Sequence, residues 1–445
     1  MLTRRTALSA IPILGLTRLV RAQSSDQVRD VANSSVSQAP VDPAALIDDQ
    51  MQQFIDEQHF GERERRGELF ILRGKAPVQV PVTNPDWVRY RTITYNNALI
   101  EAQADFVAEQ NTRNMTRTVL DFYKSADEQP PPFEDRKMPG KAADLLRKLV
   151  GVAGGKLDKE LKDMGVDPRE YESAPEAQKT ALLTNHLKTT SMQHSLGDTL
   201  GLCSVKTFEG HDGTGNYTIG VVAIASSMMR DFVQQILTAR GEFPADPARA
   251  QDLSRLYADK TGLINDFGVR RLFDENGLPV IVSFGQWASS YRGTDAGIAA
   301  TYREAARRQA ELIADGQISD FLKGSLTYDR SGTVGQEVDR IASSLPDSSS
   351  IDDTKRALDE MKRTMIRTST INITGLRTLT SWSGQHPATQ TPIIGVIRIW
   401  SAAGESQMRA MMSTKPKGAS AVATHTPPGM PGVTESRQLM DAKDF

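Results

Sequence analysis

The chain has 445 residues, and its 53 basic and 55 acidic side chains leave a formal net charge of −2. The Lys and Arg residues are scattered along the chain, which argues against a nucleic-acid-binding surface, since such a surface needs a clustered basic footprint. The length is enough for two or three domains with cores of their own.

The first residues have the pattern of a cleaved signal peptide. Arg4 and Arg5 precede an apolar stretch at 7–16, and the small residue Ala22 stands where cleavage would occur. The segment resembles the twin-arginine export motif, although Ala7 stands where that motif usually has a large apolar residue, so the general secretory route stays open. We expect residues 1–22 to be removed and the mature protein to be periplasmic.

The same stretch argues against a membrane anchor in the mature protein. It is about half the ~20 apolar residues that span a bilayer, and no second long apolar run follows. No cysteine follows it that could carry a lipid anchor. The single cysteine, Cys203, lies in mid-chain, can form no intramolecular disulfide, and is interpreted as a small core residue.

Two segments near the ends of the mature chain are rich in Ser, Ala, Pro, Gly and Thr. They are residues 23–42 and 414–445, and neither shows apolar periodicity. We therefore expect a flexible linker and a disordered tail.

Between these segments, two stretches of sequence recur in the same order. Residues 201–210 match 375–384 without a gap, and residues 219–226 match 394–401 with five of eight positions identical. Two matches in the same order indicate an internal duplication. A weaker match upstream pairs Trp87 with Trp287 and Ala102 with Ala305.

Each copy has the same predicted order of elements. A first hairpin is predicted around 73–75 in one copy and around 274–277 in the other. Apolar residues at helical spacing then predict a long helix in each, and the matched stretches form a second hairpin. Short helices at 228–237 and 405–412 close the two copies.

The sequence therefore predicts an α+β fold of two tandem related modules. Each is an antiparallel sheet covered by helices, in the rough order ββ-α-α-ββ-α. We assign residues 43–240 to the first module and 241–413 to the second, with a helical insertion at about 127–180 in the first.

This order of elements, with a strand before an Ala-rich helix and a later hairpin, resembles small α/β modules of bacterial envelope lipoproteins, flagellar collar proteins and the N-terminal domain of TolB-like proteins. It is also similar to exported bacterial proteins of unknown function built from such units. The resemblance covers both modules and rests on pattern. It implies envelope association and assembly, and it transfers no catalytic residue.

Few residues in the sequence indicate a catalytic or binding site. His211 and Asp212 lie in a Gly-rich loop between two predicted strands, and His386 falls at a similar place in the second module. A histidine and an aspartate make no nucleophilic system without a positioned Ser or Cys, so an exposed turn is the simpler interpretation. The Gly-rich run at 151–156 lacks the spacing of a phosphate loop. No zinc motif occurs, so we expect no cofactor and no metal.

Two hypotheses follow. The first is a non-enzymatic envelope protein whose modules bind a protein partner, with a homo-oligomer left open. The second is an enzyme or small-ligand binder that uses a cleft between the modules near His211, Asp212 and His386.

Methionines on the closing helices are compatible with either core packing or an adaptable surface for a partner; these are residues 228, 229, 408, 411 and 412.

Overall fold

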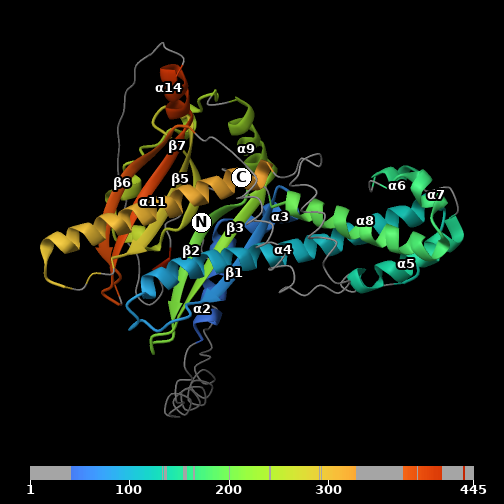
Figure 1. The fold of residues 1–445 in the computed structure, drawn as a ribbon, viewed down its shortest axis with the longest axis horizontal. Coiled ribbons are helices and arrows are strands. Elements are labelled where there is room, and N and C mark those ends of the chain that lie inside the picture. The colour runs from blue at the N-terminus through green and yellow to red at the C-terminus, as the bar shows by residue number, and fades with distance from the viewer. Residues whose placement is uncertain are drawn as a thin grey trace, which may run out of the picture. The chain divides into compact units, whose positions relative to one another are not determined.

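Two four-stranded antiparallel sheets organise the chain (Figure 1). The computed structural model describes residues 42–132, 134, 138–153, 158–163, 166–199, 201–239, 242–289, 291, 293–326, 374–387, 389–412 and 434–435. An α+β fold with antiparallel sheets is thus confirmed.

The first sheet has the strand order β1-β3-β2-β8. Its strands are β1 (Leu69–Pro77), β2 (Cys203–His211), β3 (Tyr217–Ser226) and the short β8 (Thr434–Glu435). The Ile- and Val-rich strand β3 is buried along its whole length, as expected for a central strand covered on both faces.

The second sheet has the order β4-β5-β7-β6. Its strands are β4 (Gly268–Phe273), β5 (Pro279–Ala288), β6 (Leu376–Gln385) and β7 (Pro392–Ser401). The central strands β5 and β7 are almost entirely buried, whereas β6 forms an edge and exposes much of its length.

One long helix covers each sheet. Helix α4 (Trp87–Ser125) packs on β1 and β3, and α11 (Ala296–Leu326) packs on β5 and β7. The close approach of each helix to its sheet requires a glycine in the strand beneath it. A Cβ at Gly74 would lie 2.0 Å from the Ala98 carbonyl oxygen of α4. A Cβ at Gly285 would lie 1.9 Å from the Ala310 carbonyl oxygen.

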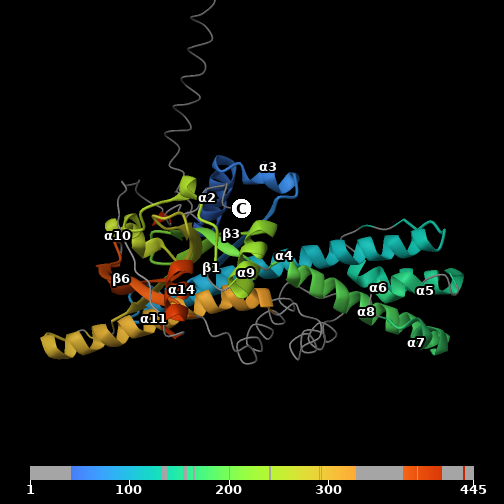
Figure 2. The ribbon, with the colours of Figure 1, turned by 90° about the horizontal axis from the view of Figure 1, so that it is seen from above.

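The distal half of α4 lies beside a group of further helices (Figure 2), with which it shares a second hydrophobic core. It packs there against α5 (Met138–Ala153) and α8 (Glu176–Gly197), with α6 (Asp158–Asp163) and α7 (Pro168–Ser173) nearby. These helices fall in and just after the segment for which the sequence predicts helices.

The remaining helices are short or flank the sheets. They are α2 (Pro43–Glu57), α3 (Phe60–Arg65), α9 (Ser227–Ala239), η3 (Pro247–Arg249), α10 (Arg255–Ala258), η4 (Gly262–Asn265) and α14 (Ala402–Met412). Both closing helices predicted from the sequence are therefore present, as α9 and α14.

The two sheets meet where β2 lies beside β4 and η4. The Cys203 thiol donates to the Val269 carbonyl oxygen at 3.1 Å, and the Thr207 hydroxyl donates to the Asn265 carbonyl oxygen. A single hydrophobic cluster extends across both sheets. The seam between them is thus filled by packed side chains.

Two details differ from the sequence predictions. The hairpin predicted at 73–75 is wrong, because β1 runs straight through these residues and pairs with β3 along its length. Trp87 and Trp287 do not occupy matching places, since Trp87 begins helix α4 whereas Trp287 lies in strand β5. The hairpin predicted at 274–277 is confirmed by the pairing of β4 with β5.

Several predictions fall outside the described residues. These include the signal peptide with Arg4, Arg5 and Ala22, and most of the tail at 414–445, where only Thr434 and Glu435 are described and pair with β2. Among the residues that are described, no helix is long and apolar enough to cross a membrane.

Candidate functional site

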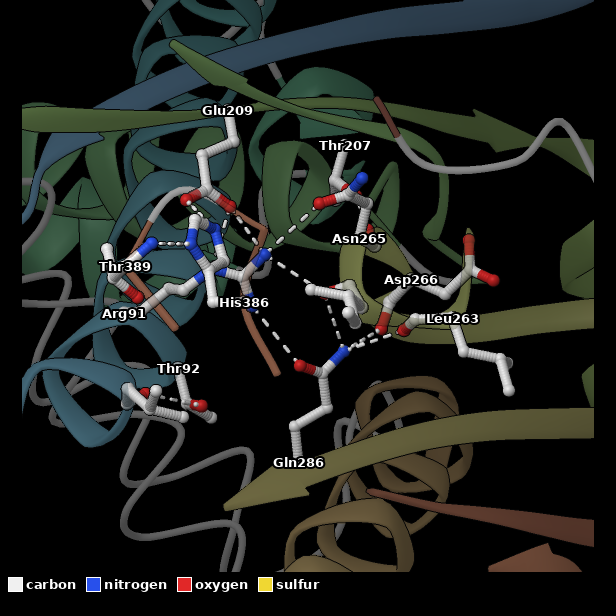
Figure 3. Close-up of polar contacts among 12 residues, drawn as sticks. Arg91, Thr92, Thr207, Glu209, Leu263, Asn265, Asp266, Gln286, His386 and Thr389 are labelled. Carbon is white, nitrogen blue, oxygen red and sulfur yellow. Dashed lines mark hydrogen bonds and ion pairs between the residues drawn. The ribbon is translucent and has the colours of Figure 1, made fainter. Parts of the chain in front are cut away.

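A buried polar cluster lies at the seam between the sheets (Figure 3). At its centre is the carboxylate of Glu209 on β2, which is 4% exposed. Arg91 of α4 donates from Nε to Glu209 Oε2 at 2.7 Å, and a second guanidinium nitrogen makes an ion pair with the same oxygen. His386, just after β6, places Nε2 3.0 Å from Glu209 Oε1.

The Arg91 guanidinium also reaches the second sheet. It donates to the Ile264 carbonyl oxygen at 2.9 Å and to Gln286 Oε1 at 3.2 Å. Its Cζ atom lies over the Phe267 ring, 4.7 Å from the ring centre. The arginine is therefore held on several sides by groups from the second sheet and the loop before it.

Gln286 of β5 completes this part of the cluster. Its amide nitrogen donates to the carbonyl oxygens of Leu263 at 3.0 Å, Ile264 at 3.0 Å and Asp266 at 2.8 Å. These bonds fix the segment around η4 against the sheet, and so fix the carbonyl oxygen that Arg91 uses.

The charges around Glu209 decide its protonation. Burial alone would raise the pKa of this carboxyl group, but the charge of Arg91 and the hydrogen bond with His386 outweigh burial and lower the pKa to about 2. Glu209 is therefore ionised at neutral pH, and its charge is balanced by Arg91.

Both ring nitrogens of His386 have partners. Nδ1 accepts from the backbone N–H of Thr389 at 3.3 Å, so the ring proton lies on Nε2 and is donated to Glu209. Trp87 packs edge-on against the imidazole with ring centres 4.8 Å apart, and Tyr217 lies 5.9 Å away. The imidazole is thus enclosed by a carboxylate, a backbone turn and two aromatic rings.

The other two predicted candidates lie at the end of β2. The carboxylate of Asp212 accepts from the backbone N–H of Thr214 at 2.7 Å and from the Asn216 side chain at 2.7 Å. Hydrogen bonds from the side chains of Asn216 and Thr214 lower the pKa of the Asp212 carboxyl group. His211 Nδ1 accepts from the Gly213 backbone N–H at 3.2 Å. Both residues therefore order the hairpin loop.

The structure brings two of the three candidates close to one aromatic ring. The His211 ring is 5.2 Å from the Tyr217 ring, and His386 packs on Tyr217 as well. Asp212 accepts hydrogen bonds from Thr214 and Asn216 within its own loop. No group of three or more His, Cys, Asp or Glu residues is placed to hold a metal ion in the part of the chain that the structure describes.

A second polar contact at the seam lies near the start of β2. The Ser204 hydroxyl is 2.9 Å from the Tyr95 hydroxyl and accepts from Arg270 Nη1 at 2.8 Å. Burial raises the pKa of Tyr95, and it raises the pKa of the neighbouring Cys203 thiol to about 11. Cys203 is therefore a protonated core residue, as the sequence indicated.

Sequence reasoning missed Arg91, Glu209 and Gln286. One signal for Arg91 was present, because it falls on the helical stripe that also carries Trp87 and Tyr95. A charged residue on an apolar stripe needs a buried partner. The sequence held no signal for the identity of that partner, which lies far along the chain.

Comparison with known proteins relates a part of the sequence to a family and the fold to a solved structure. Residues 142–238 match the family described as Domain of unknown function (DUF6844), and this match runs from α5 to α9. No curated protein matches the chain. A crystal structure of a hypothetical protein from Francisella tularensis is similar with a TM-score of 0.52 and 23% identity, covering 82% of this chain and 93% of that chain. At this identity the likeness extends to the fold alone.

Proposed function

We propose that this chain is an exported bacterial envelope protein that acts without catalysis, by binding a protein partner. The observation that carries the proposal is the state of the Glu209 cluster. Its carboxylate and both nitrogens of His386 are engaged within the protein, and the cluster is buried. Such a cluster joins parts of the fold and leaves no ring nitrogen free to move a substrate proton.

Exposed apolar side chains support a binding role. Helix α11 exposes Ile298, Tyr302 and Leu312, the last at 65%. Helix α14 exposes Met408 and Met411, so these methionines are surface residues rather than core residues. Flexible methionine side chains adapt to partner surfaces.

The partner is best sought in the native envelope by crosslinking from these surfaces. A photoreactive residue at position 312 or 411 is expected to capture one defined protein. The same residue at the exposed position 113, on helix α4, serves as a control. No specific product from either surface, in cells that contain the protein at its natural level, would contradict the binding role.

Export rests on the residues at 1–22. We expect the mature chain to begin at Gln23 and to lie in the periplasm, reached by the twin-arginine route. Replacing Arg4 and Arg5 with lysine is the direct test, read by cell fractionation and N-terminal sequencing. Retention of the variant in the cytoplasm supports the route, normal export of the variant points to general secretion, and an uncleaved cytoplasmic wild type contradicts export.

We further infer that the two sheets descend from one duplicated unit. The pairing of β1 with β3 aligns Gly74 with Val221, and the pairing of β5 with β7 aligns Gly285 with Val396. Each glycine lies beneath two alanines of the covering helix, Ala98 and Ala102 in one case and Ala310 and Ala314 in the other.

A second feature supports the same inference. Strand β2 has a bulge between Ser204 and Lys206, and β6 has one between Thr378 and Thr380. Both lie at the same place in the sequence match that begins at residues 201 and 375. The glycine contacts also correct the sequence match between the two long helices. In the structure Ala102 corresponds to Ala314, whereas the sequence match paired it with Ala305.

The alternative of an enzyme or small-ligand binder is less well supported. The Arg91 and Gln286 side chains fill the seam where a cleft was expected, and Asp212 is engaged by its own loop. Replacing His211 with alanine tests this alternative, because His211 is partly exposed and lies beside the Tyr217 ring. Loss of a measured ligand affinity without loss of stability would revive the alternative.

A further inference from the structure

The outer edge strands of the two sheets differ in how well they are protected from pairing with a further strand. Strand β1 ends the first sheet and β6 ends the second. An exposed strand edge presents unpaired N–H and C=O groups and invites another strand to pair with it. Which edge is protected therefore indicates where strand addition can occur.

The β1 edge is protected. Helix α3 lies against β1, and the Glu64 carboxylate accepts from the outward backbone N–H of Ile71 at 2.8 Å. Charged Arg73 and Lys75 follow at alternate positions, and Pro77, which has no N–H, ends the strand. Charges and proline are the usual means of blocking edge pairing.

Among the residues that the structure describes, none protects the β6 edge in these ways. Its ten residues include one charge, Arg377, and no proline, and the rest is mostly Thr, Ser, Leu and Trp. After the bulge at 379, residues 380–385 pair regularly with β7, and Trp382 lies over Gly395 and holds this stretch against the sheet. Within the described residues, β7 is the one strand that pairs with β6.

Strand addition at this place already occurs in the first sheet. Strand β2 is bulged like β6 and pairs with the neighbouring central strand in the same way. Its outer side receives β8, which pairs at Phe208 and Glu209. The matching outer side of β6 is therefore a surface that this fold can use for a further strand.

We propose that the edge of β6 pairs antiparallel with the β6 edge of a second copy of this chain. Residues 380–385 carry no charge, so twofold self-pairing of this stretch brings no like charges opposite each other. A twofold contact uses one patch on both copies and closes on itself. In each copy, β4 ends the other side of this sheet and lies against β2, so association stops at a dimer with a joined sheet of eight strands. The protected β1 edge of the first sheet offers no second site for pairing. This self-association goes beyond the proposed envelope role and does not depend on export or on another partner.

Ser381 and Ser383 supply a direct test. Both are exposed and share one face of the strand, so in a twofold pairing centred at 381, 382 or 383 these positions meet one another across the contact. Two double variants are made in the full chain, Ser381→Asp with Ser383→Asp and Ser381→Lys with Ser383→Lys. Each is expected to repel itself, and a mixture of the two is expected to pair.

The measurement is molar mass by light scattering over a range of protein concentrations. We expect the wild type to reach the mass of two chains, each double variant to need at least tenfold more protein to do so, and their equimolar mixture to recover the wild-type behaviour. Recovery on mixing also shows that both variants are folded. A control, Leu312→Asp, changes the apolar face of α11 and is expected to leave dimerisation intact.

Other results would overturn the proposal. A wild type that stays monomeric throughout contradicts it, as do double variants that dimerise like the wild type or fail to recover on mixing while their circular dichroism is native. Dimerisation lost in the Leu312→Asp control but kept in both double variants would place the contact on α11. Failure to capture an envelope partner has no bearing on these outcomes.

Discussion

Glu209 shows how a single buried charge depends on its neighbours. An ion pair in a protein interior gains little over apolar residues of the same size, because both ions lose their hydration. Removing one partner is different, since it leaves the other charge buried and uncompensated. Arg91 is fully buried and has Glu209 as its ion-pair partner, so it cannot turn to water if Glu209 is lost.

We therefore expect Glu209→Ala to lower the free energy of unfolding by about 3–5 kcal/mol. Urea denaturation followed by circular dichroism measures the change. Glu109→Ala is the matched control, because it breaks a pair with Arg113 in which both side chains are 59% exposed, and it should cost less than about 1 kcal/mol. Equal losses from the two substitutions would contradict the role assigned to the buried pair.

Cys203 gives a second residue-scale prediction. The thiol is buried, burial raises its pKa to about 11, and the reactive form of cysteine is the thiolate. A thiol reagent at pH 8 should therefore leave the native protein unlabelled for hours and modify it at once in denaturant. Mass spectrometry counts the modified chains, and rapid native labelling would show that the seam beside β2 opens readily.

At the scale of elements, helix-on-sheet packing depends on Gly74 and Gly285. A Cβ at either position would collide with the backbone of the covering helix, which cannot rotate away as a side chain can. We expect Gly74→Ala and Gly285→Ala each to lower stability by about 1–3 kcal/mol, the usual range for overpacking.

Gly61→Ala is the control for these substitutions. No atom lies within 4 Å of a Cβ built at Gly61, which lies in helix α3, so alanine there should be neutral or stabilising. Similar losses at positions 74 and 285, measured by thermal unfolding, would also agree with a common origin of the two sheets. A loss at one position and none at the other would weaken that inference.

The same glycines explain which elements the sequence could predict. Helix α4 and the strands β2, β3, β6 and β7 follow from local periodicity and from the recurring stretches, and all are present. The hairpin at 73–75 fails because a glycine between Arg73 and Lys75 resembles a turn locally, whereas Gly74 is required by contact with a helix some 25 residues later. Only the tertiary packing distinguishes these two uses of glycine.

At the scale of the whole molecule, the Glu209 cluster could not be predicted for a related reason. Arg91, Glu209, Gln286 and His386 come from widely separated parts of the chain and meet only when the two sheets are in contact. His386 was a candidate because of its position in the repeat, yet its observed role is a contact between the second sheet and β2. Contacts of this kind make the two sheets depend on each other for stability.

This dependence has a pH signature. The pKa of Glu209 is lowered from its ordinary value of 4.5 to about 2 in the folded protein, so the folded state favours the ionised form. The stabilisation is present above pH 4.5 and is lost as the pH falls towards 2, and the pKa difference corresponds to about 3 kcal/mol. A comparison with Glu209→Gln, which cannot ionise at this position, isolates this contribution, because other carboxylates titrate in the same pH range.

We expect the difference in unfolding free energy between the wild type and Glu209→Gln to be largest above pH 5 and to shrink steadily towards pH 2. A difference that stays constant over this range would mean that Glu209 is not held as an anion by Arg91 and His386.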